Sequence, residues 1–161
     1  MAASVYTNCE NAVERATGDI DFLQVIGHPA LHAISSLTGL GGELYRKYGI
    51  YLDPVTVAQV PEEYESRLVE MFPSKFKHLR LIALDPYDLA LAKLERNIGR
   101  DRSDVAFLAR TVPFDLELLE RRYKDELRLF LPNQERADLT MKLWIEMIQE
   151  EREAAAEAEH H

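Results

Sequence analysis

The hydrophobic periodicity of this chain changes at about Leu84, and this change constrains its fold more than any other feature. Before that point short apolar runs alternate with polar residues, as in Asp19–Val25, which is the period of a β-strand. Beyond it, apolar residues recur every three or four positions as far as Ile148, the period of amphipathic helices. We therefore predict an α+β fold, with a mixed β-sheet in the first half and a largely helical C-terminal half.

The length and composition fit one domain. The 161 residues are 47% hydrophobic, which is enough for one core, and no repeat or long linker divides them. We predict a single domain over 1–161, with an α/β core at 1–84, a helical half at 85–152 and an acidic tail at 153–161. His160 and His161 are typical of a purification-tag remnant and are excluded from the candidate site.

Cysteine content and the N-terminal sequence favour a reducing compartment. Cys9 is the only cysteine, so the chain forms neither an internal disulfide nor a zinc site made of cysteines. The first ten residues lack the basic and apolar regions of a signal peptide, and no run of about 18 apolar residues could span a membrane. We expect a cytoplasmic protein with no membrane segment.

Glycines, prolines and short apolar runs predict several elements before Leu84. A helix over Pro29–Leu40 is followed by glycines and then by a short helix through Tyr45. Asp53-Pro54 is expected to split 48–60 into two extended pieces, as a hairpin or a bent strand, because proline cannot donate to a central ladder. A helical turn or loop follows Pro61, and His78–Leu84 is predicted to be a strand.

The helical half has recognisable start signals and an apolar face. Four aspartates precede or begin helical patterns and are predicted to cap helices: Asp85 (with Pro86 at the first helical position), Asp101, Asp115 and Asp138. In the last helix we expect a set of apolar residues to lie in the core: Leu139, Leu143, Trp144, Met147 and Ile148.

Asp19 and Asp21 are the first candidates for chemistry. They stand two residues apart on a predicted strand, which sends both carboxylates to the same side with Cα atoms roughly 6.5 Å apart. Two like charges repel there unless a cation lies between them, and Mg²⁺ prefers such oxygen ligands. The alternative is a solvated strand edge without a metal.

The segment around these aspartates, Arg15-Ala16-Thr17-Gly18-Asp19-Ile20-Asp21-Phe22, resembles the signature of nucleotidyltransferase-like proteins, notably the abortive-infection toxin (AbiEii-like) group. The resemblance implies a nucleotidyltransferase-like mixed sheet with flanking helices. It also implies that Asp19 and Asp21 hold Mg²⁺ beneath a nucleoside triphosphate, with Asp53 as the third catalytic and metal-binding carboxylate. Asp53-Pro54 is also an ordinary turn starter, so a structural role for Asp53 stays open.

A second resemblance to the same family runs over Leu81–Asn97 and Arg100–Val105, and it implies that a helix lysine, Lys93, reaches the triphosphate. In the sequence Lys93 shares a helical face with Leu89, so its stem is expected to be half-buried. The alternative is a structural lysine whose ammonium pairs with Asp88 or a neighbour. Arg100 can likewise either pair with an acid or bind phosphate.

The charge distribution supports an anion site in this region. The whole chain has a net charge of −9, but seven basic and four acidic residues lie between Lys75 and Arg102, a local surplus of three. This surplus fits a polyphosphate site better than a broad nucleic-acid surface, although it could equally be a helix face opposite the acidic tail.

Active members of the resembled family place a Gly-Ser pair about eleven residues before the first aspartate, where it grips the triphosphate; Thr7 and Asn8 stand there in this chain. Asn8 can still donate a hydrogen bond to phosphate. The leading hypothesis is a Mg²⁺-dependent nucleotidyltransferase that acts on a hydroxyl of RNA or protein, with an antitoxin-like partner or a homodimer. A non-catalytic nucleotide- or protein-binding module is the alternative that Thr7-Asn8 favours. A Mg²⁺-dependent phosphodiesterase or nuclease would share the carboxylates.

Overall fold

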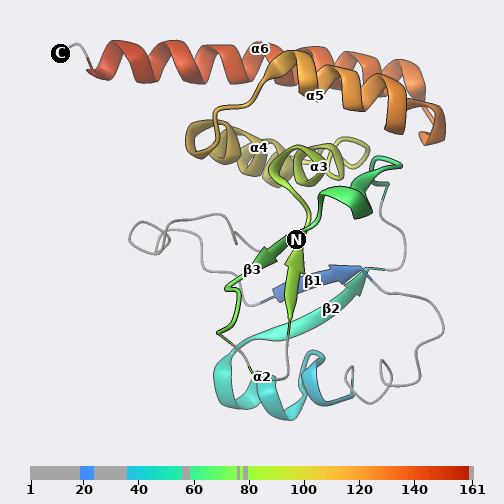
Figure 1. The fold of residues 1–161 in the computed structure, drawn as a ribbon, viewed down its shortest axis with the longest axis vertical. Helices are drawn as coiled ribbons and strands as arrows, with labels where there is room; N and C mark the ends of the chain where they lie inside the picture. Colours follow the sequence, from blue (N-terminus) through green and yellow to red (C-terminus); the bar gives the residue numbers. More distant parts are fainter. Residues whose placement is uncertain (1–18, 24–35, 56–58, 76, 78–79, 160–161) are drawn as a thin grey trace. The chain divides into compact units, whose positions relative to one another are not determined.

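The computed structural model describes residues 19–23, 36–55, 59–75, 77 and 80–159, which are drawn in colour in Figure 1. The chain forms two compact units, Met1–Ala58 and Gln59–His161. Each contains a pair of β-strands, and most of the described residues of the second are helical. This combination of helices and small sheets is of the α+β class that the periodicity predicts.

The first unit contains a parallel pair of strands, β1 (Asp19–Leu23) and β2 (Tyr51–Val55). The predicted strand at 19–25 is confirmed over its first five residues, and its last two lie outside the described residues. Helix α2 (Glu43–Tyr48) precedes β2 and runs slightly further than the predicted short helix. It ends because Gly49 adopts a φ of +69° and donates its N–H to the carbonyl of Tyr45 at 2.8 Å. Of the predicted helix over 29–40, only 36–40 are described, and 36–38 are helical.

Strand β2 runs without interruption through Asp53 and Pro54. The prediction that this dipeptide splits the segment into two pieces is therefore wrong. Proline is tolerated in a strand where its missing N–H is not needed by a neighbouring strand. Among the described residues β2 pairs with β1 alone, so half of its backbone groups face away from a strand partner.

The second unit begins with a 3₁₀ turn and a β-hairpin. The turn η2 (Tyr64–Arg67) matches the helical turn expected after Pro61. Strands β3 (Val69–Met71) and β4 (Leu81–Ala83) pair antiparallel, with Val69 opposite Ala83. Strand β4 lies inside the predicted strand 78–84, whereas β3 was not predicted, since three residues are too few to establish an alternating pattern.

Helices make up the rest of the second unit (Figure 1): α3 (Pro86–Leu91), α4 (Gly99–Thr111), α5 (Leu116–Arg122), the π-helical turn η3 (Tyr123–Leu127), the 3₁₀ turn η4 (Arg128–Phe130) and α6 (Gln134–Glu159). Helix α4 packs against both α3 and α6. The core lies between these helices, where the most buried large apolar side chains are Leu91, Leu94, Val105, Leu119, Tyr123, Leu127, Trp144 and Ile148. Burial of this apolar surface is the main favourable contribution to folding of the unit.

Two of the four predicted caps are confirmed. Asp85 accepts the N–H of Asp88 at 2.8 Å, with Pro86 as the first residue of α3. Asp115 accepts two N–H groups at the start of α5. Each carboxylate satisfies donors that the first helical turn leaves unpaired.

The other two aspartates are not N-cap residues, although Asp101 contributes to capping α4 from within its first turn. Helix α4 begins at Gly99, so Asp101 is its third residue and accepts the N–H of Ile98 at 3.0 Å from inside the first turn. Asp138 lies within α6, which begins at Gln134, and Asn133 accepts a backbone N–H there instead. Both carboxylates also bind arginine side chains. The pattern of residue types around a helix start does not predict these ion pairs.

The buried face of α6 differs in part from the predicted one. Trp144 and Ile148 are buried as expected, but the side chains of Leu139 and Leu143 are 58% and 51% exposed. The residues that face the core are instead Ala137, Met141, Trp144 and Ile148, at spacings of four, three and four. Since 3.6 residues make one turn, Leu139 and Leu143 fall on the opposite side of this helix.

Asp138 joins three elements through charged hydrogen bonds. Arg128 on η4 donates two hydrogen bonds to it, both at 2.8 Å, and the hydroxyl of Tyr123 on η3 donates a third at 2.6 Å. These bonds, those of Arg128 first, lower the pKa of the Asp138 carboxyl to about 2. Burial, together with the hydrogen bond to Asp138, raises the pKa of Tyr123.

Asp138→Asn should therefore lower the stability of the fold in a pH-dependent manner. A depressed folded-state pKa contributes stability above the unfolded pKa near 4, and that contribution is lost as the pH falls to about 2. We expect urea unfolding at pH 7 to show a loss of up to about 1 kcal/mol, since the pair is partly exposed. The difference between parent and variant should shrink between pH 4 and pH 2. A difference that is the same at both pH values would contradict this role, and Asp125→Asn on the exposed side of η3 is the control.

Candidate functional site

The three predicted catalytic aspartates lie on two adjacent strands of the first unit. Strand β1 carries Asp19 and Asp21, and β2 carries Asp53. In the parallel register Asp21 is the direct partner of Asp53, and Asp19 is the partner of Tyr51. Since neighbouring strands lie about 4.8 Å apart, the backbone brings positions 32 residues apart in the sequence next to one another.

Asp53 is exposed on its strand, whereas the side chains of Asp19 and Asp21 lie outside the described part of the structure. Among the side chains that are described, no three histidine, cysteine, aspartate or glutamate residues form a group that could hold a metal ion. The three-carboxylate site thus stays a prediction that the strand register supports. Thr7 and Asn8, expected to contact the triphosphate, also lie outside the described residues.

Lys93 lies in the second unit and is bound to acidic side chains. Its side chain is 7% exposed, and its Nζ donates to Asp104 Oδ2 at 2.9 Å and lies 3.9 Å from Asp101 Oδ1. Among the alternatives that the sequence left open, the structure thus shows an ion pair, with Asp104 rather than Asp88 as the partner. Phosphate binding by Lys93 would require that Asp104 share or release the ammonium.

The backbone around Lys93 is not the continuous helix that the spacing suggested. Helix α3 ends at Leu91, and 92–96 form turns in which the Lys93 N–H donates to the carbonyl of Ala90 at 3.0 Å. Lys93 therefore lies beyond the end of α3, and the prediction that it shares a helical face with Leu89 is wrong. Asn97 has a φ of +42°, a conformation in which a right-handed helix cannot continue.

Asp101 interacts with both basic side chains of this turn, Lys93 and Arg96. It is fully buried, and Arg96 Nε donates to it at 2.9 Å within a bidentate pair. Burial alone would raise the pKa of Asp101, but the hydrogen bonds from Arg96 and from the Ile98 N–H outweigh it and hold that pKa below its usual range. The carboxylate is therefore charged at neutral pH and helps to neutralise Lys93.

Asn97 joins the same turn to the last helix. Its Oδ1 accepts the indole N–H of Trp144 at 3.2 Å, and its Nδ2 donates to the hydroxyl of Thr140 at 3.4 Å. Both partners lie on α6 and are buried. The segment that carries Lys93 is thus attached to α4 by ion pairs and to α6 by hydrogen bonds. Arg100 lies exposed in the first turn of α4.

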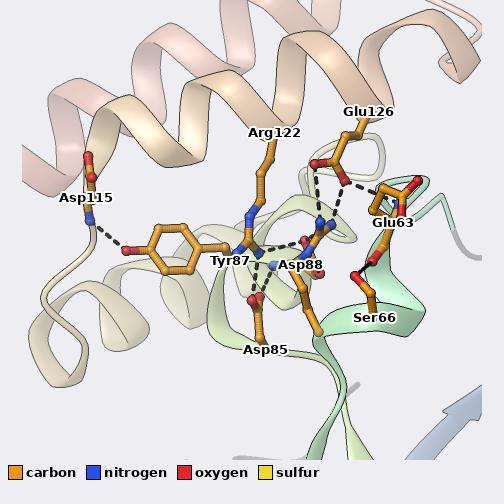
Figure 2. A network of polar contacts seen from close by, with 9 residues as sticks. Glu63, Ser66, Asp85, Tyr87, Asp88, Asp115, Arg122 and Glu126 are labelled. Carbon is orange, nitrogen blue, oxygen red and sulfur yellow. Dashed lines mark hydrogen bonds and ion pairs between the residues drawn. The ribbon is translucent and has the colours of Figure 1, made fainter.

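A second polar network surrounds Asp88, which is fully buried (Figure 2). Arg67 forms a bidentate pair with it, at 2.9 and 3.1 Å, and Arg122 donates to it at 3.1 Å. Arg67 also binds Glu126 at 2.6 Å, and Arg122 binds Asp85 at 2.6 Å. Two arginines from η2 and α5 thus bind three carboxylates, and both of them donate to Asp88, which supplies the compensation that a buried carboxylate requires.

An aromatic side chain completes the network. The guanidinium of Arg122 lies 4.9 Å from the centre of the Tyr87 ring, and the Tyr87 hydroxyl accepts the N–H of Asp115 at 2.8 Å. The Tyr87 ring packs edge-on against Phe114 at 4.9 Å. These residues position α3 against α5. No local sequence pattern predicts the network, because its charged partners stand 21 to 59 residues apart.

A groove of about 600 Å³ lies between the α5–η3 segment and α6. Its acidic and basic side chains bind one another: Asp138 pairs with Arg128, Glu120 with Lys124 at 2.7 Å, and Glu146 with Lys142 at 3.9 Å. Three acids and three bases leave no net charge to attract a phosphate or a metal ion.

Lys93→Met tests whether the ion pair at Lys93 stabilises the fold. Methionine keeps an apolar stem but removes the ammonium, so Asp101 and Asp104 lose a cation in a largely buried place. We expect the free energy of unfolding in urea to fall by about 3 kcal/mol. Lys142→Met, whose parent side chain is 74% exposed, is the matched control and should change it by less than about 1 kcal/mol. Equal losses in the two variants would contradict a structural role for the Lys93 pair.

Comparison with family models assigns this sequence to a family. A family model described as "Nucleotidyltransferase of unknown function (DUF6036)" matches residues 4–152. Searches of the curated proteins and of the solved structures found no match. The match confirms the resemblance to nucleotidyltransferases at the level of this family, while the narrower resemblance to the abortive-infection toxin group stays a prediction. No helix in the described part of the chain is both long and apolar enough to cross a membrane.

Proposed function

The chain belongs to this nucleotidyltransferase family, and we propose that it transfers a nucleotidyl group from a nucleoside triphosphate to a hydroxyl acceptor with the help of Mg²⁺. The observation that carries the proposal is the parallel register of β1 and β2, in which Asp21 is opposite Asp53 and Asp19 is two residues away. Successive side chains of a strand alternate between its two faces, so positions 19 and 21 share a face of β1. We expect the three carboxylates to converge on that face.

These residues fit a magnesium ion by their chemistry. Carboxylate oxygens are the donors that Mg²⁺ prefers, and three neighbouring negative charges repel one another unless a cation neutralises them. The bound ion would neutralise charge on the triphosphate. The chain itself would hold the ion through Asp19, Asp21 and Asp53. One of these carboxylates would accept the proton of the hydroxyl whose oxygen bonds to the α-phosphorus, while the bond to the β-phosphate breaks and pyrophosphate leaves. Positioning and charge neutralisation account for most of the expected rate.

The triphosphate needs cations or polar donors of its own, and we propose Lys93, Arg100, Thr7 and Asn8 for this role. Lys93 is constrained in this role, because its ammonium already binds Asp104 at 2.9 Å. A triphosphate carries more negative charge than one carboxylate and competes for the same ammonium. The acceptor we propose is a hydroxyl of RNA or of a protein, in a toxin–antitoxin-like setting with an antitoxin-like partner or a second copy of the chain.

One alternative is supported by specific residues. Thr7-Asn8 stands where active relatives of the resembled group have Gly-Ser, and Lys93 is engaged in an ion pair. Both features favour a non-catalytic module that binds a nucleotide or a protein with the same fold. The two functions differ in whether label is transferred from a nucleoside triphosphate.

Asp21→Asn should abolish transfer. We expect the parent, incubated with Mg²⁺, each of the four α-labelled nucleoside triphosphates and a mixture of RNA or protein acceptors, to incorporate label from at least one nucleotide. Asparagine removes one charge from the proposed metal site, and incorporation should fall by at least about 100-fold, since even residues behind the ligands of a metal commonly account for 10- to 100-fold. Asp125→Asn, on the exposed side of η3, is the control and should retain activity.

Two outcomes would contradict the proposal. If Asp21→Asn incorporates label as fast as the parent, the carboxylates are not the catalytic site. If the parent binds a nucleoside triphosphate by calorimetry but transfers no label to any acceptor, the non-catalytic module is the better account.

A further inference from the structure

The turn that joins β3 to β4 has an unusual charge composition. The fourteen residues between Glu70 and Asp85 include no acidic residue but contain Lys75, Lys77 and Arg80. In the whole chain 28 of 161 residues are acidic, so on average such a stretch would hold two or three. This segment is therefore a local positive region on a strongly negative chain, and it attracts anions.

Acidic partners compensate part of the basic charge of 75–102. Three of the cations in that stretch are bound to acids: Arg80 to Glu70 at 2.8 Å, Lys93 to Asp104 at 2.9 Å and Arg96 to Asp101. Lys75 and Lys77 lie on the acid-free turn itself and are exposed.

The backbone of the turn is strained. The N–H of Lys75 donates to the carbonyl of Phe72 at 3.1 Å, which closes a β-turn with Pro73 and Ser74 at its centre. Ser74 has a φ of +63°, a value for which glycine or asparagine is preferred, and Phe72 has a φ of +51° immediately before a proline. Such conformations persist where surrounding structure enforces them and are concentrated at recognition sites.

The strained turn holds an aromatic ring next to a cation. The Phe72 side chain is 41% exposed, and Lys75 Nζ lies 5.8 Å from the centre of its ring. An exposed ring with a lysine beside it offers a flat apolar face and positive charge in one place. A flat aromatic face and an adjacent phosphate are what each unpaired nucleotide presents.

We propose that this turn binds single-stranded nucleic acid, with a base stacked on Phe72 and the neighbouring phosphates bound by Lys75 and Lys77. A duplex would offer the lysines phosphates but the ring no free base face. An acidic peptide would satisfy the charge without using the ring, and a single ring buries too little apolar area to hold a bilayer. The inference requires no transfer of nucleotide, and so goes beyond the proposed function.

The test is the binding of a fluorescein-labelled, unstructured 12-nucleotide RNA to the full chain, followed by anisotropy at low salt in EDTA. Phe72→Leu should weaken binding about 5- to 100-fold, the range for losing one base stack, and Phe72→Trp should restore it. Lys75→Gln with Lys77→Gln should reduce the slope of log K against log salt by about 1.4, or 0.7 per phosphate contact. Lys124→Gln with Lys142→Gln, which changes two exposed lysines elsewhere in the unit, should leave the slope within about 0.5 of the parent's.

Several results would overturn the inference. Unchanged binding in Phe72→Leu, or equal affinity of the parent for the same RNA as a duplex, would show that no base stacks on the ring. Equal loss in the control pair would show that binding follows overall charge. Absence of RNA binding in the parent, or binding only to phosphatidylserine vesicles or a polyglutamate peptide, would exclude this surface for nucleic acid. The binding experiment contains EDTA and so does not depend on a metal ion. Failure to bind RNA would therefore not contradict the proposed Mg²⁺-dependent transfer, which the labelling assay tests separately.

Discussion

The second unit depends on one buried charge, the carboxylate of Asp88. It has no exposed surface, and Arg67 and Arg122 compensate its charge by donating hydrogen bonds to it. Those arginines come from η2 and α5, and each also binds a further acid. Burial alone would lower the pKa of Arg67, but its hydrogen bonds to Asp88 and Glu126 outweigh this and hold the pKa above its usual range. Loss of either arginine would leave an uncompensated charge in the interior, so the position of α3 is linked to both elements.

The same principle extends to the segment that carries the family resemblance. Asp101 is as buried as Asp88 and is neutralised by Arg96 and Lys93. Lys93, one of the residues proposed to bind phosphate, is therefore also a residue that stabilises the turn between α3 and α4. A chain that uses one lysine for both purposes must exchange Asp104 for phosphate when a nucleotide binds. In that exchange the Lys93 ammonium would have an anionic partner both before and after the nucleotide binds, which is compatible with a folded core.

Sequence reasoning succeeded where the determining contacts are local. Asp85 and Asp115 were predicted as caps because a cap is determined by residues two or three positions away. Asp101 and Asp138 were mistaken for helix starts because their carboxylates bind arginine side chains of a neighbouring turn, and a pattern of residue types does not show this. Leu139 and Leu143 have the right spacing for a buried face, but the helix turns a different side to the core.

The candidate site was predictable only in part. The alternation of side chains along a strand predicts that Asp19 and Asp21 lie on the same side. The pairing of Asp21 with Asp53, in contrast, depends on the register of two strands that 27 residues separate. The resemblance supplied Asp53 as a candidate, and the register is consistent with it. The strained turn at Phe72 could not be predicted from the sequence, because strain is a property of backbone angles and residue types alone do not reveal it.

We propose that Asp19, Asp21 and Asp53 form one cation site, which can be tested by titration with Mn²⁺, a paramagnetic substitute for Mg²⁺. Electron paramagnetic resonance of the full chain would measure free and bound Mn²⁺ in the parent, in Asp21→Asn and in Asp53→Asn. We expect the parent to bind Mn²⁺ and each variant to bind it at least about tenfold more weakly, since both carboxylates would be ligands of the same ion. Undiminished binding by Asp53→Asn, or no binding by the parent even with a nucleoside triphosphate present, would contradict it.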